Sequence, residues 1–266
     1  MNRPLRILRV VIGLNQGGVQ QAVLNLFRGL DPERFVPIAC AIENSGAIGS
    51  EIEAAGFEVV TLGLRRQPWD TVRALRKLML ERDIDIVHAS SYHPSLYARL
   101  AAIWARVPVV ISHEHVIVEH RRRRRQWLNR LLEPATDAYI AVGSLVRRQV
   151  IDWYGYPDEK VRVIHNGVDL SRFRPVDNRA ALRAKMGFPP ERPIVAMVAR
   201  LDPEKGHATL FEAISHLRGH AVTWLIIGAG RQEAEIRDLA DHYGVSDSVQ
   251  FLGMRRDIPE LLQASD

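Results

Sequence analysis

The feature that most constrains the fold is the alternation of two kinds of segment along most of the chain. Short apolar runs rich in β-branched residues, such as Leu5–Ile12, are followed by turn residues and then by stretches such as Val19–Leu30, where apolar side chains recur at helical spacing. Strands that alternate with helices in this way pair in parallel through βαβ crossovers. The sequence therefore predicts an α/β protein with doubly wound parallel sheets.

Ligands of such sheets bind at the carboxyl ends of the strands. Several predicted strands of this chain are followed by polar residues, and these segments are Asn15–Gly18, His88–His93, His113–His115, Gly143-Ser144 and Asn166-Gly167. We expect a binding site at this edge of the sheet.

The alternation is interrupted once, between His165 and Pro193. This stretch holds four prolines around one short predicted helix, Arg179–Met186, a composition typical of a linker between domains. The strand–helix pattern then resumes and continues to the last helix, Ile258–Ala264. We therefore predict two Rossmann-like domains, at residues 1–170 and 193–266, joined by a linker at 171–192, with the second domain incomplete.

Composition limits the class of protein. Hydrophobic residues make up 47% of the chain, enough for a packed core, and no apolar run approaches the ~18 residues that a membrane-spanning helix needs. The N-terminus lacks the apolar core and cleavage site of a signal peptide. The single cysteine, Cys40, excludes an intramolecular disulfide. We expect a cytoplasmic protein.

Two glycine-containing turns follow predicted strands. Gly17 and Gly18 precede a helix, where glycines let backbone N–H groups approach a ligand and the helix N-terminus favours an anion. The simpler alternative is a tight turn without a ligand. Gly228-Ala229-Gly230 also follows a strand, but Glu233 occupies the position of the third glycine of a dinucleotide fingerprint, so a dehydrogenase is not favoured.

The segment His113-Glu114-His115 ends a predicted strand and invites a metal hypothesis. Zinc proteases carry two histidines four residues apart on a helix, and this spacing differs. A polar site in which one histidine binds substrate by a hydrogen bond is the better interpretation, and a structural role is the alternative.

A second charged segment, Arg200-Leu201-Asp202-Pro203-Glu204-Lys205-Gly206, lies between a strand and a helix. Two cations five residues apart, just before a helix N-terminus, can bind a diphosphate from one side. The alternative is a solvated turn in which Arg200 pairs with Asp202 or Glu204.

Several segments, in their order and spacing, resemble retaining glycosyltransferases of family 4, and the resemblance extends along essentially all 266 residues. The matching segments are Asn15-Gln16-Gly17-Gly18, Asp85-Ile86-Val87-His88-Ala89, Val161-Arg162-Val163-Ile164-His165-Asn166-Gly167-Val168-Asp169, Arg200–Gly206, Ile227-Gly228-Ala229-Gly230 and Val249-Gln250-Phe251-Leu252-Gly253. The resemblance implies the GT-B fold, in which two Rossmann-like domains face a cleft.

The resemblance also implies a function and roles for individual residues. It implies a hexosyltransferase whose nucleotide-diphosphate-sugar donor binds mainly to the second domain, while a saccharide or lipid-linked acceptor binds mainly to the first. Arg200 and Lys205 would neutralise the donor diphosphate, a task that a metal performs in other enzymes, so no metal is expected. His115 matches the family's histidine near the transferred sugar, with His113 as its rival. The remaining assignments are Gly17 and Gly18 close to the diphosphate, Gly253 and Met254 at the nucleotide base, and Asn166 and Gly167 at the domain crossover.

The sequence departs from the family pattern at three places. Ala199 replaces the usual glycine before the paired arginine, and His165 replaces the usual proline before Asn-Gly. The resemblance also implies a pair of glutamates eight residues apart in the donor site, and these would lie beyond Asp266. Two alternatives therefore stay open: a sugar-nucleotide epimerase on the same fold, and a non-catalytic fragment or binding domain.

A run of five arginines, Arg121, Arg122, Arg123, Arg124 and Arg125, with Trp127 nearby, lies in the most basic part of the chain. The default interpretation is a solvated basic face. Attachment to anionic lipid headgroups at the inner face of the membrane is the functional alternative. Nucleic-acid binding is not favoured, because no recognition motif accompanies the run.

Overall fold

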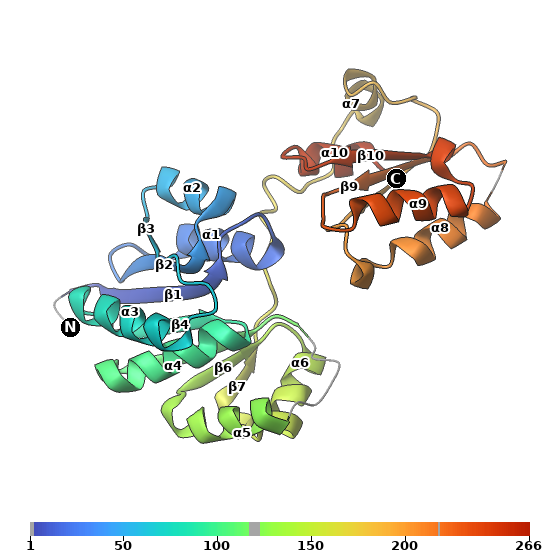
Figure 1. Cartoon of the computed structure of the whole chain (residues 1–266). Helices are drawn as coiled ribbons and strands as arrows, with labels where there is room; N and C mark the ends of the chain where they lie inside the picture. The colour runs from blue at the N-terminus through green and yellow to red at the C-terminus, as the bar shows by residue number, and fades with distance from the viewer. Residues whose placement is uncertain (1–2, 117–122, 218) are drawn as a thin grey trace. The chain divides into compact units, whose positions relative to one another are not determined.

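The computed structural model describes residues 3–116, 123–217 and 219–266. The chain forms two compact units, Met1–Val168 and Asp169–Asp266, and each is described here by itself (Figure 1). Within the described residues no helix is long and apolar enough to cross a membrane.

Unit 1 is built on a parallel sheet of seven strands in the order β3-β2-β1-β4-β5-β6-β7. Its strands are β1 Leu5–Gly13, β2 Phe35–Asn44, β3 Glu58–Thr61, β4 Ile86–Ser90, β5 Val109–Glu114, β6 Ala138–Ala141 and β7 Val161–Val163. Its α-helices are α1 Gly18–Gly29, α2 Gly46–Ala54, α3 Pro68–Glu81, α4 Tyr92–Ala105, α5 Arg123–Leu132 and α6 Ser144–Gln149. The order reverses direction at β1 and β4, which makes their carboxyl ends the switch point where doubly wound sheets bind ligands.

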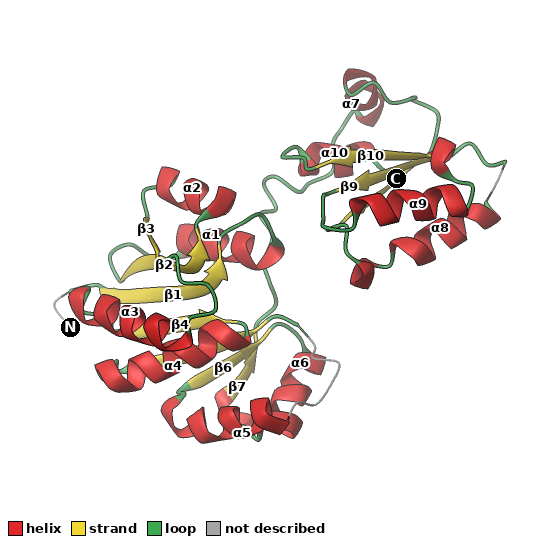
Figure 2. Cartoon of the chain, in the orientation of Figure 1, coloured by secondary structure: helices red, strands yellow, loops and turns green. Residues whose placement is uncertain are grey.

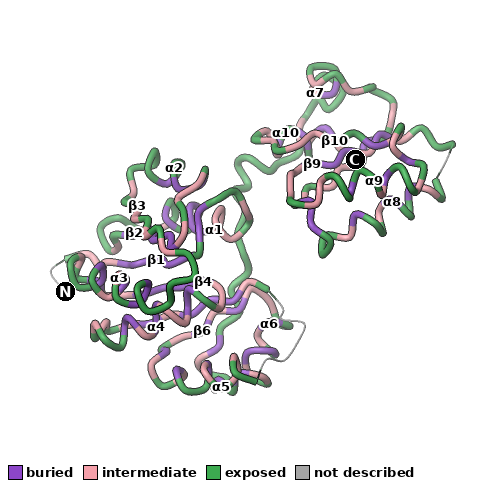
Figure 3. Tube along the Cα trace, in the orientation of Figure 1, coloured by how far each residue is buried: buried purple, intermediate pink, exposed green. Residues whose placement is uncertain are grey.

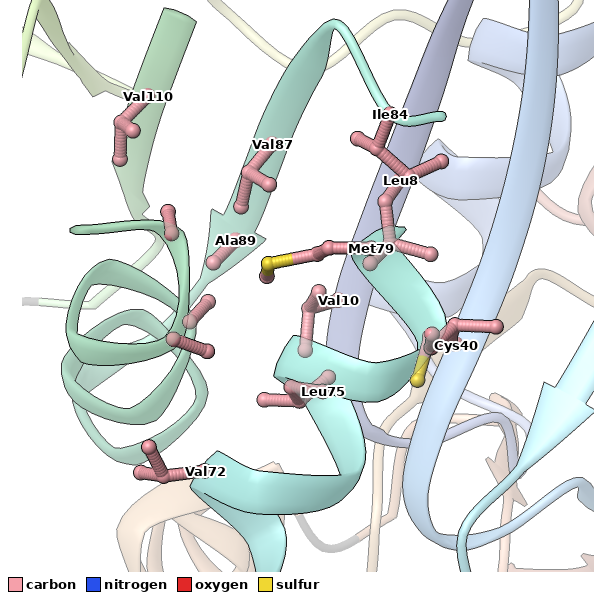
Figure 4. Packing of buried hydrophobic residues seen from close by; sticks show 14 of the residues in the cluster. Leu8, Val10, Cys40, Val72, Leu75, Met79, Ile84, Val87, Ala89 and Val110 are labelled. Atoms are coloured by element: carbon pink, nitrogen blue, oxygen red, sulfur yellow. The ribbon is translucent and has the colours of Figure 1, made fainter. Parts of the chain in front are cut away.

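The sheet of unit 1 carries a separate apolar core on each face, because successive side chains of a strand point to opposite faces. Leu8 and Val10 of β1 pack in one core with Leu75 of α3 (Figure 4), and Ala98 of α4 belongs to the same core. Val11 joins the core on the other side, which α1 and α2 cover. Figure 3 shows that the buried residues of this unit are concentrated along its strands.

Unit 2 has a three-stranded parallel sheet in the order β10-β9-β8. Its strands are β8 Ile194–Val198, β9 Thr223–Ile227 and β10 Val249–Gly253, and its α-helices are α7 Arg179–Lys185, α8 His207–His216, α9 Glu233–His242 and α10 Ile258–Ala264 (Figure 2). Phe211, Ile226 and Ile236 are at the centre of one core. Leu225 and Leu261 belong to a second.

The stretch 171–192, expected as a linker, lies within unit 2. The reason is Arg183 of α7, which is 6% exposed. Its guanidinium donates to the backbone oxygens of Ala264, at 2.8 Å, and Pro190, at 2.9 Å, and pairs with the Asp266 carboxylate at 2.5 Å. These contacts fix α7 to α10, a consequence that the proline-rich composition does not reveal.

The α/β fold with two parallel sheets is confirmed, and the predicted strands are present with shifted ends. One helix differs from what the sequence predicts, which is a single helix over Ser144–Tyr154 with Ser144 as its N-cap. The segment 144–154 forms α6 and then a π-helical turn at Val150–Tyr154. Gly143, rather than Ser144, is the N-cap of α6, and no side chain caps it.

Candidate active site

The carboxyl ends of β1, β4 and β5 bring a polar cluster together at the switch point of unit 1. Arg9 pairs with His88 in the sheet register, and Ser90 pairs with His113. Because Arg9 alternates with Leu8 and Val10, it lies on the face opposite to their apolar core. The predicted polar segments at the ends of β4 and β5 therefore lie side by side. The Arg9 guanidinium, which belongs to none of the sequence motifs, lies next to them.

Hydrogen bonds connect this cluster across the three strands. The Arg9 guanidinium donates to the His88 backbone oxygen at 3.2 Å and to Ser90 Oγ at 2.5 Å. Ser90 Oγ lies 3.0 Å from Nε2 of His115. The ring centroids of His113 and His115 are 4.0 Å apart and stacked. His88 Nε2 lies 3.2 Å from His113 Nδ1. The chain thus holds His115 from two sides.

The imidazoles of the cluster are neutral at physiological pH. Burial, followed by the charge of Arg9, lowers the pKa of His115 to about 4. Burial, together with His115 and Arg9, lowers the pKa of His113 to about 2. Burial also holds the pKa of His88 well below its usual range. Within the described ranges no group of three or more His, Cys, Asp or Glu side chains is arranged to hold a metal ion.

The N-terminus of α1 adds an open backbone surface to unit 1. A Cβ atom built on Gly18 would meet nothing within 4 Å, and one on Gly17 would meet only the flexible Gln20 side chain within 3 Å. Gly46 differs, because its φ is +58° and a Cβ there would lie 2.4 Å from the Asn15 side chain. The fold therefore requires glycine at 46 but not at 17 or 18, which leaves the space beside α1 available to a ligand.

In unit 2 the segment 199–206 follows β8 and leads into α8. Its backbone passes so close to the loop after β9 that a Cβ on Gly228 would lie 2.0 Å from the Ala199 oxygen, and one on Gly230 would lie 2.1 Å from the Leu201 oxygen. The Gly228 N–H in turn donates to the Gly253 oxygen at 2.9 Å. Gly228 and Gly230 thus fix the loop that carries Arg200.

The two cations of this loop have different surroundings. The Arg200 side chain is 59% exposed and pairs with Asp202 at 2.5 Å and Glu204 at 2.9 Å. The Asp202 side chain is only 7% exposed, so the ion pair ties the exposed guanidinium to a buried carboxylate. Lys205 is exposed and ends a short turn before Gly206, whose φ of +76° lets α8 begin.

A surface pocket of about 550 Å³ adjoins Arg200, and its lining is Arg200, Asp202, Pro203, Glu204, Arg231 and Gln232. Gly253 ends β10 with a φ of +64°, and Met254 after it is 55% exposed. The structure therefore brings Arg200, Lys205 and Gly253 to the carboxyl ends of the strands of unit 2.

The segment predicted at the domain crossover lies at the end of unit 1. The Gly167 oxygen accepts a 3.4 Å hydrogen bond from Asn25 of α1, and Asn166 is exposed. His165 contacts the Val142 oxygen through Nδ1 at 2.9 Å. The boundary between the units follows Val168.

Two family models match the chain. The model described as Glycosyltransferase Family 4 matches residues 16–172. The model described as Glycosyl transferases group 1 matches residues 178–266. The chain belongs to glycosyltransferase family 4.

Relatives of this chain are named as glycosyltransferases. A Bacillus subtilis protein named as a glycosyltransferase, EpsF, is 30% identical over 98% of the chain and 71% of its own length. An Escherichia coli enzyme named UDP-Gal:alpha-D-GlcNAc-diphosphoundecaprenol alpha-1,3-galactosyltransferase is 28% identical over 94% of the chain and 68% of its own length.

Solved structures share the fold. The Anabaena HepE structure with UDP and glucose has a TM-score of 0.84 at 21% identity and covers 98% of the chain and 72% of its own. A Neisseria meningitidis UDP-GlcNAc 2-epimerase has a TM-score of 0.66 at 13% identity over 97% of the chain and 75% of its own. The fold alone thus does not separate transferases from epimerases.

Sequence reasoning did not identify Arg9 as a candidate site residue of this glycosyltransferase. A signal for it exists in the sequence, because a cation in the middle of the apolar strand Leu5–Ile12 is unusual. What the sequence could not show is that β4 supplies the backbone oxygen and the hydroxyl that accept its hydrogen bonds.

Proposed function

We propose that this family 4 glycosyltransferase transfers a hexose from a nucleotide-diphosphate sugar to an acceptor hydroxyl, with retention at the anomeric carbon and without a metal. The observation that carries the proposal is the loop 199–206, which presents Arg200 and Lys205 next to the N-terminus of α8. A helix N-terminus and two cations together favour a diphosphate.

The chemistry assigned to this loop is stabilisation of a leaving group. As the glycosidic bond of the donor breaks, negative charge develops on the nucleotide diphosphate, and fixed cations lower the energy of that state. Asp202 holds the Arg200 guanidinium in place, while Glu204, with 56% of its side chain exposed, can be displaced by the phosphates. The HepE complexes with UDP and with UDP-glucose support a donor of this class.

Unit 1 supplies the neutral part of the proposed site. His115 offers a hydrogen bond to the transferred sugar, and Gly17 and Gly18 allow the donor to approach the α1 backbone. The E. coli relative is named for a diphosphoundecaprenol-linked acceptor. A Corynebacterium glutamicum relative, 26% identical, is named for a phosphatidylinositol mannoside. These names favour a lipid-linked acceptor for this chain.

Calorimetric titration of the chain with UDP-sugars and GDP-sugars tests the donor site. We expect Arg200→Ala and Lys205→Ala each to weaken donor binding about 10- to 100-fold, because each removes charge-assisted hydrogen bonds. Lys185→Ala, at the end of α7, is the matched control and should bind as the wild type does. Donor affinity that is unchanged in both loop variants would refute the proposal.

Product analysis tests the reaction. NMR of the product formed with an acceptor and EDTA reports both the anomeric configuration and the need for a metal. An inverted linkage, or activity that EDTA abolishes, would refute retention or metal independence. A sugar-nucleotide epimer formed without any acceptor would instead identify an epimerase.

We further propose that α5 contacts anionic lipid. Arg123, Trp127 and Leu131 lie on one face of α5, four residues apart, and Trp127 and Leu131 are 63% and 59% exposed. Basic and aromatic residues on one exposed helix face suit a membrane interface. Arg121 and Arg122 lie outside the described residues.

Co-sedimentation with phosphatidylglycerol and with phosphatidylcholine vesicles tests this contact. We expect binding to the anionic vesicles alone, and we expect Trp127→Ala to reduce it. Trp69→Ala, on α3 and 70% exposed, is the control. Equal binding to both vesicle types would refute the electrostatic contact.

A further inference from the structure

The polar cluster at β1, β4 and β5 contains buried atoms that lack partners. Within the described part of the chain, Nδ1 of His115, Nε2 of His113 and Nε of Arg9 make no hydrogen bond. Buried polar atoms nearly always have a partner, so the two imidazole atoms mark places for the oxygen of a ligand or a water. What each atom can offer there depends on where the protons of the imidazoles lie.

We propose that Arg9 and Ser90 are positioning residues that hold His115 neutral with its proton on Nδ1. His115 is then a fixed hydrogen-bond donor toward a substrate oxygen, and it is neither an acid nor a base during the reaction. The importance of this tautomer for sugar transfer rests on the proposed function, but the tautomer itself can be measured without any substrate.

The first step is the direction of the hydrogen bond between Arg9 and Ser90. A guanidinium has only donors, so Ser90 Oγ must accept the 2.5 Å bond from Arg9. Arg9 is 2% exposed, and burial lowers its pKa to about 9, which leaves it a cation at neutral pH. One lone pair of the Ser90 hydroxyl is therefore always occupied.

The second step is the single proton of Ser90. Ser90 is 1% exposed, and its Oγ lies 3.0 Å from His115 Nε2. If Nε2 carried a proton, the hydroxyl would accept twice and its own proton would have no acceptor among the described residues. When the hydroxyl donates to Nε2 instead, both a lone pair and the proton of Ser90 Oγ, and the lone pair of His115 Nε2, have partners. The network therefore assigns the His115 proton to Nδ1.

The third step is the charge state. The titratable and charged groups that face His115 are Arg9 of β1, His88 of β4 and His113 of β5, the strand that ends just before His115. The two histidines are neutral, so Arg9 supplies the only formal charge among these groups. A like charge disfavours protonation. Arg9 thus acts on His115 twice, through Ser90 and through its charge.

Long-range ¹H–¹⁵N correlation spectra of the chain labelled with [¹⁵N]histidine test the proposal, with His115→Gln for assignment. We expect Nε2 of His115 to show the shift of an unprotonated nitrogen from pH 6 to 8. In Ser90→Ala the ratio of the two tautomers should change at least ~10-fold, because the donor to Nε2 is lost. In Arg9→Met the pKa of His115 should rise by about one unit or more.

Controls separate this role from a merely structural one. Ser112→Ala removes a fully buried hydroxyl from β5 that has no partner in the described chain, so it should leave the His115 tautomer unchanged. Ser90→Thr keeps the hydroxyl and should restore the wild-type ratio. Ser90→Ala carries the test if Arg9→Met does not fold.

Two outcomes would overturn the proposal: a proton on Nε2 in the wild type, or an unchanged tautomer ratio in Ser90→Ala. Donor titration of the same samples keeps the two proposals apart. Absent donor binding with the Nδ1–H tautomer intact would refute the proposed function alone.

Discussion

Replacement of Gly18 by alanine tests whether this glycine is needed for donor binding rather than for folding. Gly18 is the first residue of α1, it is exposed, and a Cβ there meets no atom within 4 Å. Alanine costs less backbone entropy than glycine in a helix, so we expect Gly18→Ala to leave the free energy of unfolding unchanged or to raise it by up to ~1 kcal/mol. The same substitution should weaken donor binding, because the methyl group fills the space beside the α1 backbone.

The matched comparison is Gly46→Ala. There the added Cβ would lie 2.7 Å from the Asn15 Cα atom, and φ is +58°. We expect a loss of about 1–3 kcal/mol in the free energy of unfolding. Urea unfolding measures stability, and calorimetric titration with the UDP-sugar measures donor binding. A Gly18→Ala variant that is destabilised, or that binds donor as tightly as the wild type, would refute the reasoning.

Three further substitutions test other parts of the structure. Gly230→Ala should destabilise unit 2 by about 1–3 kcal/mol and lower donor affinity, since its Cβ would meet the backbone of the loop that carries Arg200; an unchanged melting temperature would contradict this. Burial raises the pKa of Glu114 to about 7, so the folded state holds a proton that the unfolded state loses from pH 4.5 upward. Stability from this group is therefore lost as pH rises through 7, and Glu114→Gln should remove about 2–3 kcal/mol of the difference between urea unfolding at pH 5 and at pH 8. Arg183→Ala should cost about 2–4 kcal/mol in urea unfolding, because it leaves the buried Ala264 oxygen and the part-buried Pro190 oxygen unpaired, whereas the exposed Arg179→Ala should cost under ~1 kcal/mol.

The strands, most helices and the positions of the polar loops could be predicted because they depend on local pattern. Apolar periodicity located β1 and α1, and glycines after strands located the turns. The sequence could not show that the fold tolerates a side chain at position 18 but not at position 230, since both glycines follow a strand and precede a helix. Only the backbone around each shows that Gly230 faces the Leu201 oxygen while Gly18 faces open space.

The residues that sequence reasoning assigned differently or left out depend on contacts between distant segments. Arg9 and Ser90 are 81 positions apart, and Arg183 and Asp266 are 83 apart. In both pairs a buried arginine is acceptable only because the fold brings acceptors to it. Composition gave Arg183 to a linker and left Arg9 without a role, because neither pattern nor motif records what lies across the sheet.

The polar groups at the strand ends of unit 1 and unit 2 differ in their charge. In unit 1 the three histidines are neutral and Arg9 is buried, so the site offers hydrogen bonds without an exposed cation of its own. In unit 2 Arg200 and Lys205 are exposed at the carboxyl ends of the strands. We therefore expect unit 2 to attract the diphosphate of the proposed donor, and we expect this attraction to weaken as ionic strength rises, because exposed charges are screened. Recognition of sugar hydroxyls by His115 should stay nearly constant with salt and with pH above about 5, because a neutral donor fixed by Ser90 carries no charge for ions to screen and lies above its own pKa of about 4.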